Sequence, residues 1–310
     1  MKASFAAGTV PALAPFAAGL VVGFLLVAPG FGADALLNLD LVATPHWPAP
    51  RSVWGLGPEL PRAVPLELGI SLLARVLGGA DAVLLYYVIC VSISFGGMHR
   101  MVKGLGFGRL EAWTAATLFG TSPFLLTRMG VGHLTMVGAW AILPLVHRRL
   151  LRPSERVGAL FLAGGSMAIM GFYGGLLAGI CVLAGLVWES DRRPLPVLGT
   201  LVASQTVWLI PGLVLLLQGP DLGDSSQFPS GVGGWLGLFR LVTGHGFWQS
   251  LFQVGGGSIV VVITVGVLAV AFALAGVARL DRDWLKPAAT AAAVAGVLVL
   301  ADALPLVDSA

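Results

Sequence analysis

The sequence predicts an all-α membrane protein with about nine transmembrane helices and a cytoplasmic N-terminus. The first reason is composition: of the 310 residues 57% are hydrophobic and only 11% are charged, and the mean hydropathy is +0.91. A soluble domain of this length needs far more charge on its surface. The second reason is that the apolar runs reach or approach the roughly 20 residues that cross the hydrocarbon layer as a helix. The chain also lacks the alternation, over segments of about ten residues, that is typical of barrel strands.

The apolar runs are assigned in chain order within one transmembrane domain, residues 1–310. The first run follows Lys2 and is longer than the apolar part of a typical signal peptide, so it is expected to stay as a span, although GADA at 32–35 resembles a cleavage site. Tight turns near 126–132 and 172–174 are expected to separate broken or tilted helices. The predicted spans are 10–29, 80–98, 110–126, 132–147, 157–172, 174–189, 196–217, 255–278 and 287–304.

The charges agree with this order of spans. With the N-terminus inside, most of the 18 Lys and Arg residues fall on the cytoplasmic side and most of the 15 Asp and Glu residues fall outside. An excess of bases inside is typical of multi-pass proteins of the cell membrane. One helix over 157–189 would place a basic loop outside, so two helices are predicted there. The bases form short clusters and no contiguous stripe, so the expected partners include membrane lipids and no nucleic acid.

Two long polar loops, 30–79 and 218–254, are predicted on the outer face. The first contains an apolar stretch, 66–78, that is too short to cross the membrane. One helical face of this stretch consists of Leu68, Leu72, Leu73 and Val76. Such a segment is expected to lie on the membrane surface as a short interfacial helix.

The first outer loop concentrates acidic residues and prolines beside the membrane. Asp40 follows the first span, and Pro45, Pro48 and Pro50 restrict the backbone after it. A carboxylate fixed there could deprotonate an acceptor hydroxyl or bind a divalent cation, or it could be a solvated loop aspartate. Asp34 lies nearer the end of the span, where a role at the helix boundary is expected.

Three more residues of this loop are candidates. Glu59 and Arg62 occur in GPELPRAVPLE, where prolines again restrict the backbone. The planar guanidinium of Arg62 suits phosphate oxygens, whether they belong to a substrate or to a lipid headgroup. His46 could be a base or a metal ligand, or an interfacial residue beside Trp47.

Arg128 and His133 are predicted in a turn between two spans on the outer face. An arginine in so apolar a turn needs an anion or backbone carbonyls, and either a donor phosphate or an internal carboxylate would satisfy it. His133 could donate a hydrogen bond nearby or have a purely structural role, and the same alternatives apply to His245, in TGHGFWQ. No predicted span has a charged residue near its middle, which weakens a transport function.

Several mostly apolar motifs of low specificity resemble those of a known family. They are the loop with Asp40 and GLGPELPRAVPLE, then SPFLLTRMGVGHLTMVGAWAILPLV, SQTVWLIPGL and LVTGHGFWQ, and together they extend over most of residues 31–250. In order and spacing they resemble the multispanning glycosyltransferases of the C-type membrane fold, which use polyprenyl-phosphate sugars. The likeness is greatest to the actinobacterial branch that includes the arabinofuranosyltransferases of cell-wall assembly.

This resemblance implies an inverting transferase that passes a sugar from a polyprenyl-phosphate donor to a glycan or lipid-linked acceptor on the extracytoplasmic face. It makes Asp40 the candidate catalytic base or metal ligand, with Glu59 as a second carboxylate and a divalent cation as the candidate cofactor. The substrate-binding candidates are Arg62, Arg128, His133, His46 and His245. The alternatives are a transporter or flippase of lipid-linked glycans and a non-catalytic membrane relative.

Two features depart from the family. Its members usually have more spans and often a soluble region, whereas this chain ends at LPLVDSA after the ninth predicted span. A fragment or a shortened relative is therefore expected. The residues around Asp40 also differ from the acidic motif of the family.

Overall fold

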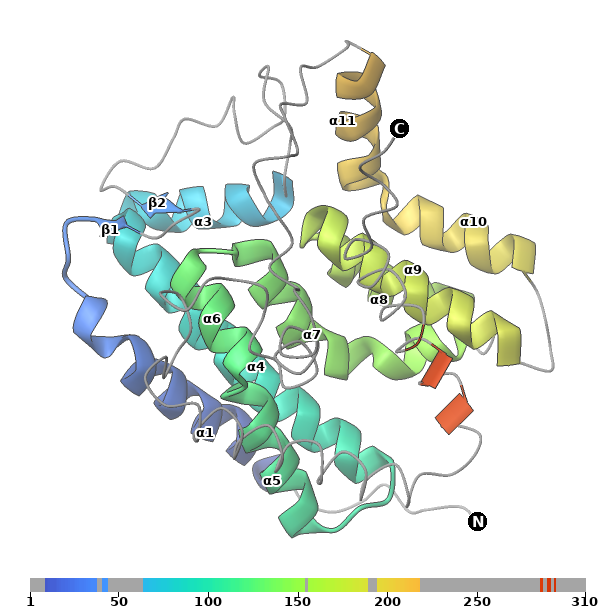
Figure 1. Cartoon of the computed structure of the whole chain (residues 1–310), viewed down its shortest axis with the longest axis horizontal. Helices are drawn as coiled ribbons and strands as arrows, with labels where there is room; N and C mark the ends of the chain where they lie inside the picture. The colour runs from blue at the N-terminus through green and yellow to red at the C-terminus, as the bar shows by residue number, and fades with distance from the viewer. Residues whose placement is uncertain are drawn as a thin grey trace, which may run out of the picture.

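The computed structural model is mostly helical, as the sequence predicts, and adds one very short hairpin (Figure 1). It describes residues 9–37, 41–43, 64–153, 156–188, 194–217, 285–286, 289–290 and 293. The elements are α1 (Thr9–Val27), η1 (Ala28–Gly30), β1 (Leu36–Leu37), β2 (Val42–Ala43), α3 (Val64–Leu77), α4 (Gly79–Gly104), α5 (Arg109–Gly120), α6 (Pro123–Val131), α7 (Leu134–Leu151), α8 (Val157–Ala168), α9 (Gly171–Trp188), α10 (Pro194–Ser204) and α11 (Thr206–Leu217).

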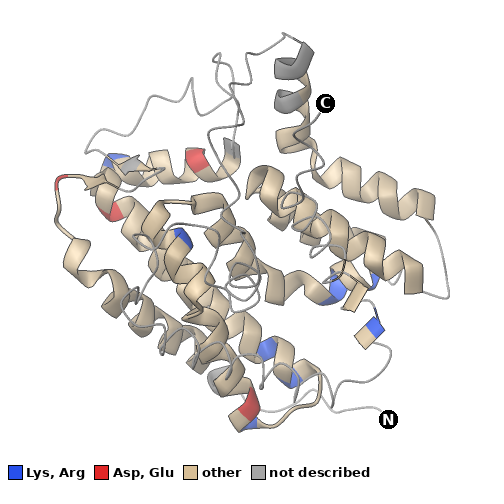
Figure 2. Ribbon diagram, viewed as in Figure 1, with Lys and Arg blue, Asp and Glu red and all other residues tan. Residues whose placement is uncertain are grey.

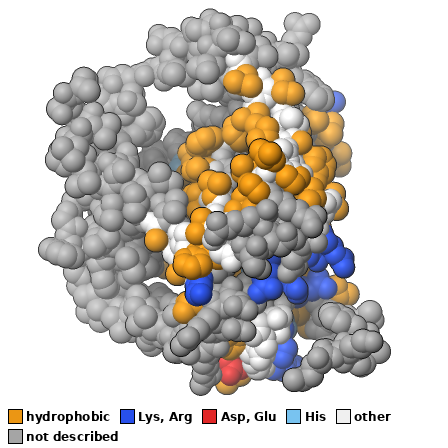
Figure 3. Space-filling view, turned by 90° about the vertical axis from the view of Figure 1, so that its right-hand side faces the viewer, with side chains coloured by type: hydrophobic (Ala, Val, Ile, Leu, Met, Phe, Trp, Pro, Cys, Tyr) orange, Lys and Arg blue, Asp and Glu red, His pale blue; other side chains and the backbone are white. Residues whose placement is uncertain are grey.

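Four helical segments of the described chain are long and apolar enough to cross a membrane. They are Leu13–Gly30, Gly79–Gly104, Leu134–Leu151 and Gly171–Trp188. The predicted spans at 255–278 and 287–304 lie outside the described residues, apart from 289–290 and 293. Large hydrophobic side chains are exposed along the described helices, and Figure 3 shows them as a broad band on one face. Because a soluble protein rarely exposes such a surface, the band supports a membrane protein.

Helix α4 is the centre of the bundle, and α1 packs against it in the opposite direction. The Ser92 hydroxyl donates a 2.8 Å hydrogen bond to the Phe16 carbonyl of α1. Glycines permit this close approach: a methyl group on Gly19 would lie 2.7 Å from Ser92 Cα, and one on Gly23 would lie 3.0 Å from Val88 Cα. Small residues at such positions let two transmembrane helices pack backbone to backbone.

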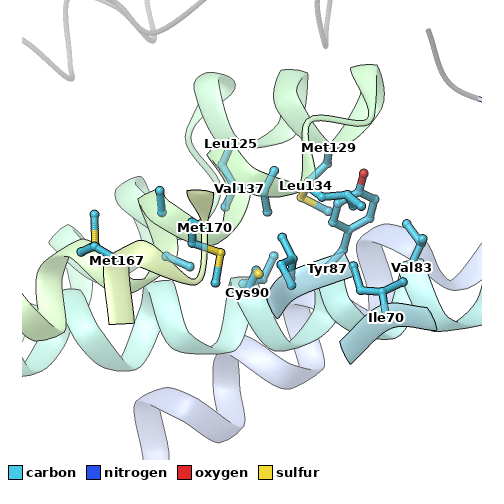
Figure 4. Close-up of a cluster of buried hydrophobic side chains, with 14 of the residues drawn as sticks. Ile70, Val83, Tyr87, Cys90, Leu125, Met129, Leu134, Val137, Met167 and Met170 are labelled. Atoms are coloured by element: carbon cyan, nitrogen blue, oxygen red, sulfur yellow. The ribbon is translucent and has the colours of Figure 1, made fainter. Parts of the chain in front are cut away.

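Helices α7 and α9 run in the same direction as α4. The Tyr86 hydroxyl donates to the Leu134 carbonyl at 2.8 Å, and a methyl group on Gly97 would lie 3.4 Å from Pro144 Cβ. The end of α9 reaches the end of α7, since a methyl group on Gly185 would approach the Leu151 carbonyl. The core is formed by these helices together with α3, α6 and α8 (Figure 4), and its labelled members are Ile70, Val83, Tyr87, Cys90, Leu125, Met129, Leu134, Val137, Met167 and Met170.

These directions give the bundle two distinct ends. We call the end where α4, α7 and α9 begin the loop end, because the chain after α1 joins it there. We call the end where these helices finish the basic end. Figure 2 shows Lys and Arg concentrated toward one end of the bundle. The described bases of the basic end are Arg100, Lys103, Arg109, Arg148, Arg149, Arg152, Arg156 and Lys286.

Two predicted spans are divided in the structure, and one predicted turn is displaced. The span 110–126 is divided, because α5 ends at Gly120 and Ser122–Pro123 starts α6. The predicted turn at 172–174 lies earlier in the structure, at Ile169–Met170, where α8 has ended and α9 begins at Gly171 with φ +63°.

The span 196–217 is also divided, between α10 and α11 at Gln205. The buried side-chain amide of Gln205 donates to the Gly164 carbonyl of α8 at 2.9 Å and to Ser204 Oγ at 3.0 Å. Its oxygen accepts from Trp208 Nε1 at 2.8 Å. Hydrogen bonds of this kind satisfy a polar side chain in an apolar bundle and stabilise the break.

The short helix predicted at 66–78 is present as α3, which packs against α4. Leu66, Ile70 and Ala74 are buried. Leu72 and Val76, from the face that the sequence analysis assigned to the membrane surface, are 53% and 82% exposed. The helix therefore has one face in the bundle and a second apolar face outside it, an arrangement that suits an interfacial helix.

Candidate functional site

Of the residues proposed from the sequence for the site, the structure describes Arg128 and His133. The others are outside the described residues, namely Asp40, His46, Glu59, Arg62 and His245. Nearby described carboxylates are Asp34, which is exposed, Glu67 in the first turn of α3, and Asp81 in the first turn of α4. The candidate site can therefore be built from the α6–α7 corner and from the ends of the first loop.

The α6–α7 corner is formed by strong local signals. Ser122 caps α6 by accepting a 3.3 Å hydrogen bond from the Leu125 amide, and Pro123 occupies the first helical position. Gly132 ends the helix with φ +95°, a left-handed conformation that strongly favours glycine. The amide groups of Gly132 and His133 donate to the Arg128 carbonyl at 3.1 and 2.9 Å.

This geometry corrects the position predicted for Arg128. The residue lies in the last turn of α6, and the turn itself is made by Gly132 and His133. Arg128 is only 4% exposed, which is rare for an arginine. The predicted spans 110–126 and 132–147 left Arg128 between them, and the prediction therefore put it in a turn.

Arg128 is held by an imidazole and by an aromatic ring. Its Nη1 lies 3.2 Å from His133 Nδ1, and its guanidinium carbon lies 5.3 Å from the centre of the Phe124 ring. Because a guanidinium group only donates hydrogen bonds, His133 Nδ1 is the acceptor, and the proton of a neutral ring is on Nε2. His133 was expected to donate, and this geometry leaves that role to Nε2. The ring face of Phe124 adds a favourable cation–π contact.

An aromatic cluster packs against the α6–α7 corner. The Trp140 ring stacks on Phe119 with centroids 4.4 Å apart and an interplanar angle of 8°, and it lies 4.7 Å from the Phe124 ring. Trp140 Nε1 donates to the Phe119 carbonyl at 3.4 Å. The cluster therefore joins α5, α6 and α7 and fixes the ring over which Arg128 lies.

The first loop meets the bundle at the same end as this corner. The Gly32 amide donates to Asp81 Oδ1 at 3.0 Å, and a methyl group on Gly30 would lie 3.1 Å from Leu84 Cδ1. Tyr86, one turn further along α4, bonds the Leu134 carbonyl at the start of α7. The chain after α1 and the α6–α7 corner are thus attached to adjacent turns of α4.

A short hairpin extends from this attachment. Strands β1 and β2 pair Leu36 with Ala43 and Leu37 with Val42, and Ala43 is completely buried. The predicted catalytic residue Asp40 falls between these strands in the sequence, outside the described residues. Within the described part of the chain, no three His, Cys, Asp or Glu residues come together as a metal site.

The sequence analysis missed a second group of residues, at the basic end. Arg100 of α4 and His147 and Arg148 of α7 line an open hollow of about 260 Å³. The sequence analysis used both arginines only to orient the spans. Two basic residues at the ends of neighbouring spans were a signal, but their proximity is a result of helix packing.

The chain was compared with known proteins in three ways. No protein-family model matches it, and no curated protein or solved structure matches it either.

Proposed function

We propose that this chain is a membrane glycosyltransferase that moves a sugar from a polyprenyl-phosphate donor to a glycan or lipid-linked acceptor. The proposal places the chemistry at the loop end and assigns that end to the extracytoplasmic face. It rests on the family resemblance of the motifs at residues 31–67 and 122–146. The structural observation that supports it is that the start of the first outer loop and the α6–α7 corner are attached to adjacent turns of α4.

The chemistry needs a base and a clamp for the leaving phosphate. In the proposed reaction, an acceptor hydroxyl attacks the anomeric carbon, the bond to the polyprenyl phosphate breaks, and Asp40 takes the hydroxyl proton. Glu59 is the second candidate carboxylate. A transition state with oxocarbenium character gains from a nearby carboxylate and from fixed positive charge at the leaving oxygen.

The two arginines of the proposal have different roles. Arg62 in the loop is the candidate direct ligand of the donor phosphate. Arg128 is enclosed, so we assign it a positioning role: it holds the α6–α7 corner and adds a fixed positive charge. His133 keeps Arg128 oriented through the contact with Nδ1. His46 and His245 are assigned to donor or acceptor binding.

The apolar surface is compatible with a lipid-linked donor. Exposed leucine, valine and phenylalanine side chains continue along α1, α8 and α9. A polyprenyl chain can remain in the membrane beside such a surface while its phosphate reaches the loop end. A soluble nucleotide-sugar donor would gain nothing from this arrangement.

The direct test is transfer of labelled arabinofuranose from its polyprenyl phosphate by the purified full chain, with a cell-wall arabinan as acceptor. We expect the native chain to transfer the label and Asp40→Asn to be at least about 100-fold slower, because a general base contributes on this scale. Asp34→Asn is the matched control, since it removes the same charge from the same loop, and it should retain activity.

The possible results distinguish the proposed glycosyltransferase function from the proposed role of Asp40. A folded native chain that transfers no sugar from polyprenyl-phosphate donors would remove the proposed function. Equal activity of Asp40→Asn and the native chain would keep the function and remove Asp40 from the mechanism.

A further inference from the structure

The basic end contains a hollow that the proposed function does not use. It is open, has a volume of about 260 Å³, and lies between the last turns of α4 and α7. Arg100, Gly104, Leu145, His147 and Arg148 are among the residues that line it. Its position is opposite to the loop end along the same two helices.

The lining is cationic. Arg100 and Arg148 are exposed at the hollow, and among its described lining residues none is acidic. Guanidinium groups are well suited to phosphate because their donors match two phosphate oxygens at once. The His147 ring is held in place, since its Nδ1 donates a 2.7 Å hydrogen bond to the Pro144 carbonyl, which can only accept.

The hollow has open space for a ligand, and its border includes an apolar side chain. Apart from its chain neighbours and the backbone of α4, a methyl group on Gly104 would meet no atom within 4 Å, so the hollow is open at this position. Leu145 on the α7 side is 42% exposed. Figure 3 shows Lys and Arg side chains gathered beside the hydrophobic band of one face. A ligand with an anionic head and apolar chains satisfies both surfaces together.

We propose that this hollow binds the phosphate headgroup of an anionic lipid, such as phosphatidylglycerol, in the leaflet at the basic end. Membrane orientation requires bases near this end, but it does not require two arginines and a fixed imidazole around one open hollow. Basic pockets between transmembrane helices on the cytoplasmic side are typical binding sites of anionic headgroups. The proposal is independent of the glycosyltransferase function.

The test is binding of phosphatidylglycerol and phosphatidylcholine to the purified full chain, measured by native mass spectrometry as lipid is added to the micelles. We expect the native chain to prefer phosphatidylglycerol. The double variant Arg100→Gln/Arg148→Gln should bind it roughly thirtyfold more weakly, because each base near an anionic headgroup contributes about fivefold. The matched control is the double variant Arg149→Gln/Arg152→Gln, which removes two charges from the same end of α7 outside the lining of the hollow, and it should lose no more than about fivefold.

A second variant tests the shape of the hollow while all charges remain. Gly104→Leu should fill the empty space and weaken phosphatidylglycerol binding on the order of tenfold, without a loss of melting temperature. This variant keeps the proposal testable if the double variant folds poorly.

Three results would overturn the proposal. The first is unchanged preference for phosphatidylglycerol in both the double variant and Gly104→Leu. The second is an equal loss in Arg149→Gln/Arg152→Gln, which would indicate diffuse attraction to the whole basic end. The third is binding of soluble glycerol 1-phosphate as tightly as phosphatidylglycerol, which would assign the hollow to a soluble phosphate.

Discussion

The two ends of the bundle hold their arginines in different ways. At the loop end, Arg128 is 4% exposed, lies over the Phe124 ring and donates to His133 Nδ1. At the basic end, Arg100 and Arg148 are exposed around an open hollow. An enclosed arginine contributes mainly to the stability and geometry of its surroundings, whereas an exposed pair beside a hollow can also be reached by a ligand. Equivalent substitutions at the two ends should therefore affect different measurements.

The largest difference is expected for tryptophan. Trp140→Ala removes the stack on Phe119 and the wall behind Phe124, and it should lower the free energy of unfolding by about 3 kcal/mol. Trp188 lies at the basic end, where it is 49% exposed and contacts Thr290 and Lys286. Trp188→Ala should cost less than about 1 kcal/mol. Unfolding in mixed micelles measures the free energy of unfolding of both variants. Equal losses would contradict the expected difference between the loop end and the basic end.

The arginines should show the next largest difference. Arg128→Gln removes a charge-assisted hydrogen bond and a cation–π contact, so it should lower the free energy of unfolding by about 2 kcal/mol. Arg100 lies over the Phe16 ring at 5.8 Å but is exposed, and Arg100→Gln should cost less than about 1 kcal/mol. Phosphatidylglycerol binding should follow the reverse order. The comparison fails if Arg128→Gln unfolds like the native chain.

Two glycines should give effects of opposite sign. Gly132 has φ +95°, so a side chain there is strained, and Gly132→Ala should destabilise the chain by about 1 kcal/mol. Gly104 ends α4 beside empty space, and Gly104→Ala should be neutral or should stabilise by up to about 1 kcal/mol. Melting temperatures of the two variants in the same detergent measure this contrast. A loss in both would mean that the backbone at Gly104 is also constrained.

The elements that could be predicted from the sequence are those fixed by local patterns. The helix predicted at 80–98 is α4, and the one predicted at 66–78 is α3, because their apolar patterns are clear, although α4 continues through basic residues to Gly104. The division at Ser122–Pro123 was also predictable, since a capping serine before proline is a strong start signal. The sequence analysis overlooked it because the apolar run continues through Phe124.

Other features depend on contacts between distant residues. The break at Gln205 is stabilised by the Gly164 carbonyl, 41 positions away. The enclosure of Arg128 depends on Phe124 and His133, and so on the angle between α6 and α7. The hollow needs Arg100 and Arg148 from two helices that become neighbours only on folding. The roles of Asp40, Glu59 and Arg62 stay predictions.

The predicted orientation of the bundle has its two ends on opposite sides of the membrane, with the loop end outside. It is tested by labelling single cysteines in intact cells with a membrane-impermeant maleimide. Asp34→Cys marks the loop end and Lys103→Cys marks the basic end; both positions are exposed. The native chain is the blank for Cys90 and Cys181. We predict that Asp34→Cys is labelled in intact cells and Lys103→Cys only after permeabilisation. Labelling of Lys103→Cys in intact cells, with Asp34→Cys protected, would contradict the account.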